Sequence, residues 1–286
     1  MVRRRFLEAG AMRLEFAPGL GGAVTALTRD GAPLLRPTPL DARDALQTAC
    51  FPLIPYANRI AHGRVVFAGR SATLPPNLAG HPHPLHGEGW RTAWQVEDQA
   101  RDRVVLSYSS EAGPWPWKYS ACQTIHLDPR GVTLELALTN TDTQAAPVGL
   151  GFHPYFPDPG DARLTARLGG LWLTDAQGLP TGHVDGWFLA DWRRGARVAG
   201  ERLIDHCHSG WDGAALIDVG TAEMRMTASP ELAWLHIYAP PAAGFFCVEP
   251  VSQRPDALNA ADPIDQGIRL VAPGETFSVW MTLQVA

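Results

Sequence analysis

The stretch Val132-Thr-Leu-Glu-Leu-Ala-Leu-Thr139 alternates apolar and polar side chains, and this alternation decides the fold class. Successive side chains of a β-strand point to opposite faces of a sheet, so a period of two is typical of a half-buried strand. The same pattern occurs near the start of the chain, in Met12-Arg-Leu-Glu-Phe16, and at its end, in Thr276-Phe-Ser-Val-Trp-Met-Thr-Leu-Gln-Val285. The sequence therefore predicts strands along its whole length.

Shorter strands are predicted between these three, at residues 104–109, 120–127, 222–227 and 234–238. Turn signals such as Asp30-Gly31 and Pro273-Gly274 separate the predicted strands. A short helix is predicted only at residues 41–49. Closely spaced strands without intervening helices favour antiparallel pairing, so we expect an all-β protein built as a large antiparallel β-sandwich.

The length of 286 residues allows one large domain or two ordinary ones. A folded chain of this size buries about 70–75% of the surface that its unfolded form exposes, so a stable core needs neither a disulfide nor a metal. No shift in composition and no flexible linker divides the sequence. We therefore expect a single domain over residues 1–286.

The charge balance and the missing motifs argue against several classes of function. The chain has 24 basic and 29 acidic residues, a net charge of −5, and no basic stripe of the kind that nucleic-acid-binding proteins carry. Lys118 is the only lysine, so a Schiff-base enzyme would have to use it. Neither a G-x-x-x-x-G-K-[ST] phosphate loop nor a G-x-G-x-x-G fingerprint occurs, so the sequence gives no support for a nucleotide cofactor.

Cysteine usage and hydropathy favour a cytoplasmic location. The four cysteines are widely spaced and form no C-x-x-C motif, which favours buried free thiols in a reducing compartment. The basic start Met1-Val-Arg-Arg-Arg-Phe6 is typical of a signal peptide, but Glu8 and Arg13 interrupt it before an apolar run develops. No stretch approaches the ~18 apolar residues of a membrane span. We expect a cytoplasmic protein that contacts neither membranes nor nucleic acid.

The first segment that could carry chemistry is Phe51-Pro-Leu-Ile-Pro-Tyr-Ala-Asn-Arg-Ile60. Two prolines stiffen the backbone ahead of Asn58 and Arg59. The planar guanidinium of Arg59 presents five donors in a fixed fork, which suits neighbouring hydroxyls or a carboxylate. The alternative is that Arg59 pairs with an acid of purely structural importance.

The second segment, His81-Pro-His-Pro-Leu-His-Gly-Glu-Gly-Trp90, allows two interpretations. His81, His83 and Glu88 resemble the H-x-H plus Glu ligand set of cupin metal sites. However, the two prolines force an extended or polyproline backbone that does not fit a sheet strand. His86 is the more suggestive residue, because Gly87 and Gly89 allow the backbone to approach closely around it.

Two later segments each contain one ionisable residue in an apolar strand. His153 lies among aromatic residues in Gly149-Leu-Gly-Phe-His-Pro-Tyr-Phe156, where burial can displace the pKa of its ring. Glu249 ends the apolar run Gly244-Phe-Phe-Cys-Val-Glu-Pro250. Burial there raises the pKa of a carboxyl group and can produce a general base. The alternatives are a core histidine and a carboxylate paired with an arginine.

Taken in order, these segments resemble the aldose 1-epimerase (galactose mutarotase) family. The resemblance rests on Asn58-Arg59-Ile60 with Gly63, on Leu85-His86-Gly87 with Trp90 and Trp94, on Gly151-Phe-His-Pro-Tyr-Phe156, on Asp205 and on Glu249-Pro250. It implies a β-supersandwich with an open sugar-binding cleft and no cofactor or metal. The implied activity is that of an isomerase, the interconversion of the α and β anomers of a free aldohexose.

The resemblance also implies a role for each matching residue. Glu249 would be the general base, and His153, as an imidazolium, the general acid. His86 would support them as an acid or a hydrogen-bond partner. Arg59 and Asp205 would hold sugar hydroxyls, and Asn58 precedes Arg59 in the same motif.

Three other functions remain as alternatives. A hexose-6-phosphate 1-epimerase would use the same chemistry and could bind the phosphate with Arg91 or Arg254. A noncatalytic carbohydrate-binding protein would need the sandwich but not His86, His153 and Glu249. A cupin-like metalloprotein would use the histidine-rich segment. The partner expected is a small-molecule sugar, and the expected oligomeric state is a monomer or a homodimer.

Overall fold

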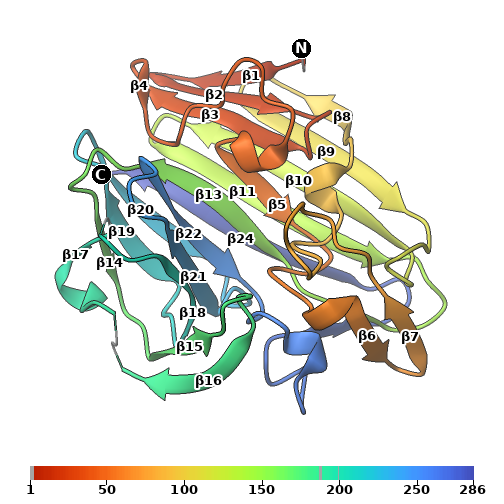
Figure 1. Ribbon diagram of the computed structural model, residues 1–286. Coiled ribbons are helices and arrows are strands. Elements are labelled where there is room, and N and C mark those ends of the chain that lie inside the picture. Colours follow the sequence, from red (N-terminus) through yellow and green to blue (C-terminus); the bar gives the residue numbers. More distant parts are fainter. Residues whose placement is uncertain (1–2, 187–188, 199) are drawn as a thin grey trace.

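The computed structural model describes residues 3–186, 189–198 and 200–286 as two large antiparallel sheets and two small ones (Figure 1). The prediction of one domain over residues 1–286 thus includes positions outside the described residues. The same is true of the N-terminal features predicted from Met1 onward. Among the described residues, none of the helices is long and apolar enough to cross a membrane.

The first large sheet, here called the site sheet, has eleven strands. In spatial order they are β1 (Arg5–Ala9), β2 (Met12–Ala17), β3 (Ala23–Arg29), β5 (Cys50–Leu53), β13 (Gly151–Pro157), β22 (Phe245–Val251), β21 (Trp234–Ala239), β18 (Ile204–Ser209), β15 (Gly170–Thr174) and β16 (Pro180–Asp185), with β4 (Ala32–Pro33) paired to β3. Every pair of neighbours is antiparallel, so strands from the N-terminal, middle and C-terminal parts of the chain meet in the centre of this sheet.

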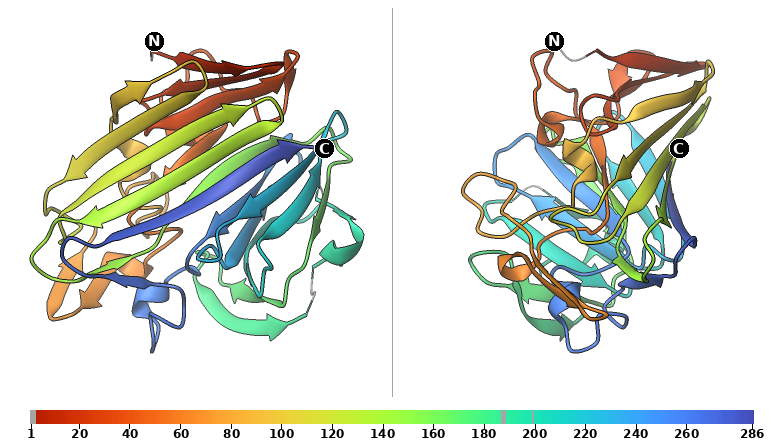
Figure 2. Two further views of the ribbon diagram at one scale, coloured as in Figure 1. Left: turned by 180° about the vertical axis from the view of Figure 1, so that it is seen from behind. Right: turned by 90° about the vertical axis from the view of Figure 1, so that its right-hand side faces the viewer.

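The second large sheet, here called the back sheet, has nine strands. In spatial order they are β17 (Ala196–Arg197), β14 (Arg163–Ala166), β19 (Ala214–Asp218), β20 (Glu223–Ala228), β24 (Thr276–Val285), β11 (Gly131–Asn140), β10 (Tyr119–Asp128), β9 (Arg103–Ser110) and β8 (Gln95–Gln99). Seen from behind, this sheet lies in front of the site sheet (Figure 2). The fold is nearly all-β and matches the predicted β-sandwich.

Short elements connect and cover the two layers. The small sheets pair β12 (Ala146–Val148) with β23 (Arg269–Val271) and β6 (Arg64–Phe67) with β7 (Arg70–Thr73). The described helices are single 3₁₀ turns: η1 (Ala45–Gln47), η2 (Ala61–Gly63), η3 (Gly89–Arg91), η4 (Trp192–Arg194) and η5 (Ala257–Asn259).

The apolar and polar residues whose alternation predicted the strands lie on opposite faces of each strand. In β11, Val132, Leu134, Leu136 and Leu138 are buried, and they lie in the same hydrophobic cluster as residues of the site sheet. Burying a side chain of this size contributes roughly 1.5–3 kcal/mol, so the facing rows of apolar residues stabilise the sandwich. The core fills the space between the sheets, and the other face of the site sheet is left for function.

Two predictions of local structure need correction. The helix predicted at residues 41–49 is only the 3₁₀ turn η1, which Asp44 caps through a hydrogen bond from the Leu46 backbone N–H. The chain cannot continue as a helix there, because the Ala49 N–H already donates to the Val24 carbonyl and β5 begins at the next residue. All four cysteines are free, and three are buried as predicted, but Cys122 points outward from β10 and is exposed.

Candidate active site

Four neighbouring strands of the site sheet each contribute one ionisable side chain to the same place. His153 comes from β13, Glu249 from β22, His236 from β21 and Asp205 from β18, in the order in which these strands lie in the sheet. Glu249 and His236 are direct partners in the strand register. The antiparallel pairing thus assembles residues that are as far as 96 positions apart in the sequence, from 153 to 249.

Two loop segments complete the site on the side of β5. Asn58 and His86 are joined by two hydrogen bonds. The His86 backbone N–H donates to the Asn58 carbonyl at 2.9 Å, and the Asn58 backbone N–H donates to His86 Nδ1 at 3.1 Å. Both residues have positive φ angles, 56° and 59°, a conformation that costs energy for a non-glycine residue. Gly87 follows with φ 69° and packs against Ile54, where an added Cβ would lie 2.1 Å from the Ile54 oxygen. The glycine thus permits the close approach expected from the sequence.

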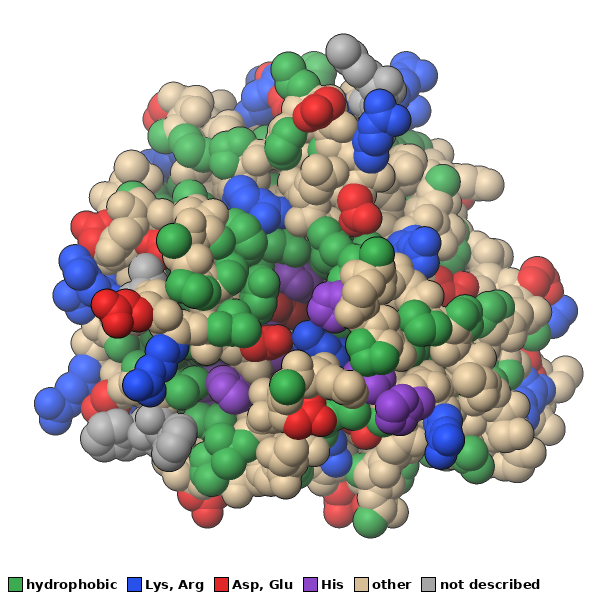
Figure 3. Space-filling view, in the orientation of Figure 1, with side chains coloured by type: hydrophobic (Ala, Val, Ile, Leu, Met, Phe, Trp, Pro, Cys, Tyr) green, Lys and Arg blue, Asp and Glu red, His purple; other side chains and the backbone are tan. Residues whose placement is uncertain are grey.

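These residues line a cleft of about 260 Å³. All six residues predicted from the sequence lie on its walls: Asn58, Arg59, His86, His153, Asp205 and Glu249. The space-filling view shows a hollow near the middle of this face, where histidine, acidic and basic side chains meet among hydrophobic ones (Figure 3). The structure therefore brings the predicted residues together, although their roles stay predictions.

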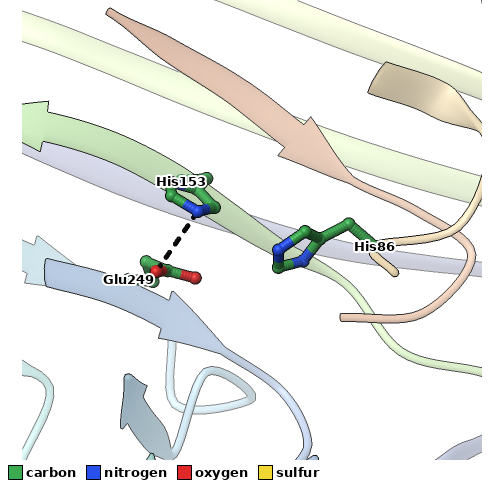
Figure 4. A group of neighbouring side chains, drawn as sticks. All are labelled: His86, His153 and Glu249. Carbon is green, nitrogen blue, oxygen red and sulfur yellow. Dashed lines mark ion pairs between the residues drawn. The ribbon is translucent and has the colours of Figure 1, made fainter. Parts of the chain in front are cut away.

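His153 and Glu249 form a buried pair in the cleft. His153 Nε2 lies 3.3 Å from Glu249 Oε1, and the two side chains are only 6% and 3% exposed (Figure 4). The His153 ring packs against both Phe51 and Tyr155, with centroid distances of 4.6 Å to each. The Arg36 guanidinium lies 3.6 Å from the centroid of Tyr155. This stack fixes the orientation of the imidazole.

Burial shifts the two groups in opposite directions. Loss of hydration raises the pKa of Glu249 to about 7, and the nearby Asp205 charge adds to this shift. Loss of hydration lowers the pKa of His153 to about 3, and the positive charges of His236 and Arg36 add to that shift. Glu249 therefore has the raised pKa that the sequence predicted for a base.

The prediction that His153 carries a positive charge needs correction for the resting protein. With its pKa lowered to about 3, the ring is neutral at neutral pH. The physical reason is that the aromatic stack excludes water while two cationic side chains lie nearby. The proton of the pair resides mainly on Glu249 when the cleft is empty, and His153 becomes an acid only after receiving it.

His86 presents a hydrogen-bond donor to the cleft. Its Nδ1 accepts the Asn58 N–H, so the proton of the neutral ring must reside on Nε2. Burial and the positive charge of neighbouring groups hold the pKa of His86 well below its usual value, which keeps the ring neutral. His86 thus offers a fixed N–H to an oxygen atom of a ligand.

A metal ion does not fit the hydrogen bonds of this cluster, although its spacing is suggestive. Ligand atoms of His86, His153 and Glu249 lie within 4.8 Å of one another. A metal-binding histidine normally donates its other N–H to an acceptor, whereas His86 Nδ1 receives an N–H. With Nε2 protonated, His86 has no lone pair left for a metal.

The cupin-like ligand set predicted as an alternative is not assembled. His81 is exposed at the rim of the cleft, while His83 is buried and bonds to the His62 N–H and to Gln177. Glu88 lines a separate cavity of about 190 Å³ and accepts a hydrogen bond from Ser110. The prolines of this segment turn its side chains toward different surroundings.

Arg59 and Asp205 form a polar, charged part of the cleft wall. Arg59 Nη2 donates to Asp205 Oδ2 at 3.3 Å, and Nη1 donates to Asn58 Oδ1 at 3.1 Å. Despite burial, hydrogen bonding to His236 and the Arg59 charge hold the pKa of Asp205 well below its usual value. A permanent cation and a permanent anion therefore face the cleft side by side.

Several lining residues were not predicted from the sequence. The most important is His236, and the others include Tyr155, Tyr238 and Phe245. One signal for His236 was present: in the predicted strand at residues 234–238, Leu235 and Ile237 face the core, so His236 points to the opposite face. The sequence could not show that Asp205 and Glu249 lie on both sides of it.

The two arginines predicted as alternative phosphate ligands do not line this cleft. Arg91 lines the separate cavity beside Glu88. Arg254 is buried, donates to Gln266 at 2.7 Å and lies 4.3 Å from the centroid of Trp172. Neither arginine therefore supports the alternative of a hexose-6-phosphate 1-epimerase.

Comparison with known proteins agrees with this geometry. The profile of the family described as aldose 1-epimerase matches residues 7–284. The chain belongs to the aldose 1-epimerase family. It is 32% identical over 294 residues to the uncharacterized protein YphB of Escherichia coli K12, which covers 98% of this chain and 97% of that protein.

Solved structures of the aldose 1-epimerase fold superpose on the whole chain. A candidate aldose 1-epimerase from Escherichia coli K12 has a TM-score of 0.93 and 30% identity, covering 100% of this chain and 99% of that one. A galactose mutarotase-like protein from Clostridium acetobutylicum has a TM-score of 0.87 and 19% identity, covering 100% and 95%. The β-supersandwich expected from the resemblance is confirmed.

Proposed function

We propose that this protein is a cofactor-independent aldose 1-epimerase that interconverts the α and β anomers of a free aldohexose. The observation that carries the proposal is the contact of 3.3 Å between His153 and Glu249 inside the cleft. A base and an acid in contact can act on two neighbouring oxygens of one sugar. Membership of the aldose 1-epimerase family supports the same reaction class.

The reaction needs two proton transfers. Glu249 accepts the proton of the anomeric hydroxyl, and the electrons of that O–H bond form the carbonyl at C1 as the C1–O5 bond breaks. O5 takes the electrons of the broken bond and receives a proton from His153. Rotation about the C1–C2 bond and closure by the reverse transfers give the other anomer. Each such transfer contributes about 10²–10⁴ to the rate.

The pair can supply both transfers with one proton. In the resting cleft this proton resides on Glu249, and the 3.3 Å contact lets it pass to His153 Nε2. The form with Glu249 ionised and His153 protonated is the reactive one. Both forms contain the same number of protons, so the apparent pKa values belong to the pair and not to either residue.

The remaining walls suit a sugar. Arg59 and Asp205 offer donors and acceptors for hydroxyl groups, and His86 offers its Nε2–H to an oxygen near the reacting centre. Tyr155 and Phe245 provide apolar surface for the C–H face of the ring. The arrangement supports a catalytic site over a surface that only binds a sugar.

Polarimetry of freshly dissolved sugars tests the proposal. We expect the protein to accelerate the change in optical rotation of a free aldohexose such as glucose or galactose, and to do so equally in excess chelator. Glucose 6-phosphate serves as the comparison substrate. Binding without acceleration would favour a noncatalytic carbohydrate-binding protein, and activity lost in chelator and restored by a divalent metal would contradict the mechanism.

A further inference from the structure

His236 is a buried histidine of the cleft to which the mechanism gives no role. It lies in the middle of β21, between β18 and β22, and is 3% exposed. Its register partners are Cys207 in β18 and Glu249 in β22. The titratable groups around it come from β18, β22, β13 and the loop before η3: Asp205, Cys207, His208, Glu249, His153 and His86.

One ring nitrogen of His236 has a close carboxylate acceptor. Nε2 lies 2.7 Å from Asp205 Oδ1, at the short end of the range for an N–H donor and typical of a charge-assisted hydrogen bond. The side chain of Cys207, the strand-register partner of His236 in β18, also lies beside the ring and favours its protonated form. The Asn58 amide nitrogen is 3.5 Å from Nδ1, too far for a strong bond that would require a lone pair there.

The surrounding charges favour the protonated ring. Burial works against a charge on His236, but the nearby Glu249 and the hydrogen bond to Asp205 outweigh it and raise the pKa of His236 to about 10. Because the pKa values of His86 and His153 are lowered, His236 differs from both of these histidines. Its ring is an imidazolium at neutral pH.

We propose that His236 is a positioning residue that holds a positive charge between the carboxylate of Asp205 and the carboxyl group of Glu249. This inference rests on the proposed epimerase function. On one side the charge, together with Arg59, fixes Asp205 for a sugar hydroxyl. On the other side it favours the ionised form of Glu249, which is the form of the carboxyl group in the reactive state of the pair.

The substitution His236→Gln tests the charge while leaving an amide donor for Asp205. An opposite charge within about 4–6 Å lowers the pKa of a carboxyl group by about 1–3 units. Removing this charge raises the pKa of the Glu249–His153 pair. The alkaline limb of kcat/KM is therefore expected to move to higher pH by about one unit.

The control is His208→Gln. His208 is another buried histidine of the site sheet, 2% exposed, but burial lowers its pKa to about 3 and it does not line the cleft. Its substitution is expected to leave the alkaline limb of kcat/KM where it is in the natural protein. An equal shift in both variants would mean that a general disturbance of the sheet, and not the charge of His236, moves the limb.

Nuclear magnetic resonance of the full chain with ¹⁵N-labelled histidine tests the charge directly. We expect one of the ten histidines to keep protons on both ring nitrogens up to about pH 9, and this signal to be absent from His236→Gln. A neutral ring at His236 at pH 7 would overturn the proposal, even if the variant did not fold. An unchanged alkaline limb in a folded His236→Gln protein would overturn it as well.

The two proposals fail in different ways. If the natural protein does not accelerate mutarotation of any aldohexose, the proposed function is wrong, whereas the histidine spectra still report the charge of His236. If the enzyme is active but His236 is neutral, only the inference about His236 is wrong.

Discussion

Among single residues, the surroundings determine which group accepts and which group donates a proton. Glu249 and His153 are both buried in the same cleft, yet loss of hydration raises the pKa of Glu249 and lowers the pKa of His153. With pKa values of about 7 for Glu249 and about 3 for His153, moving the proton from Glu249 to His153 across their 3.3 Å contact is uphill, so the form with Glu249 ionised and His153 protonated is the minor one. The contact still gives the proton a direct path in either direction, as an epimerisation requires.

The substitution His153→Asn is expected to lower kcat by about 10²-fold or more while KM changes little. The proton donated to O5 matters in the transition state and much less in the ground state. Initial rates of optical-rotation change at several sugar concentrations give both constants. Near-normal kcat with a raised KM would instead make His153 a sugar-holding residue, and His86 the better choice for the acid.

The pH dependence of kcat/KM is expected to show a broad plateau with an alkaline limb near pH 7. The raised pKa of Glu249 means that the pair keeps its proton below about pH 7 and loses it above. The lowered pKa of His153 means that a second proton binds only near pH 3. The natural protein should therefore lose kcat/KM as the pH rises above 7, and His153→Asn should lack this limb. A rise in kcat/KM through pH 7 in the natural protein would contradict the shared-proton mechanism.

Among the elements, the loop between β7 and η3 contains His86, and its contacts with the chain just after β5 determine where His86 lies. The bridge between Ile54 and Gly87 and the reciprocal hydrogen bonds of Asn58 and His86 attach this loop to the end of β5. The position of the His86 donor thus depends on a backbone contact that only glycine permits.

Gly87→Ala is expected to reduce kcat by at least about tenfold, because a Cβ would lie 2.1 Å from the Ile54 oxygen and displace His86. Gly69→Ala is the matched control. Gly69 has a positive φ of 80°, and nothing lies within 4 Å of its added Cβ. In both variants, placing alanine at a positive φ lowers the folding stability by about 1 kcal/mol. Only Gly87→Ala should lose activity as well. Equal kcat values in the two folded variants would show that the loop contact does not position His86.

The sequence predicted elements well where a single face of a strand is buried. The alternating strands at residues 12–17, 131–140 and 276–285 were recognisable because burial on one face imposes a period of two. Their neighbours in the sheets were not predictable, since β13 pairs with β5 and β22, which lie far from it in the sequence. Register between distant strands depends on the packing of the whole core.

The candidate site was predictable in part for a similar reason. Short motifs around Arg59, His86, His153 and Glu249 were visible in the sequence, and all four line the cleft. His236 has no such motif, and its importance comes from two acids on neighbouring strands. The neutral state of resting His153 also depends on groups brought to it by the fold, such as Arg36 stacked on Tyr155.

In the whole molecule, one hydrophobic cluster joins the two large sheets. It contains residues of the site sheet such as Leu14 and Phe152 and residues of the back sheet such as Leu134 and Met281. The site lies on the face of the site sheet that this core leaves free. A shared core of this kind supports the prediction that the chain is one domain.

Unfolding is therefore expected to follow one cooperative transition. Loss of near-ultraviolet circular dichroism from the ten tryptophans and loss of strand signal in the far ultraviolet should coincide in urea. Two separated transitions would contradict the single-domain prediction and indicate that the sheets unfold independently.

The measurement that most directly tests the central claim is the rate of optical-rotation change of a freshly dissolved aldohexose with the natural protein and with Glu249→Gln. Glutamine keeps the shape of the side chain but cannot accept the anomeric proton. We predict that the natural protein accelerates the change and that the folded variant, still able to bind the sugar, loses at least about 10²-fold in kcat. A variant that keeps more than about a tenth of the natural rate would contradict the role of Glu249 as the general base.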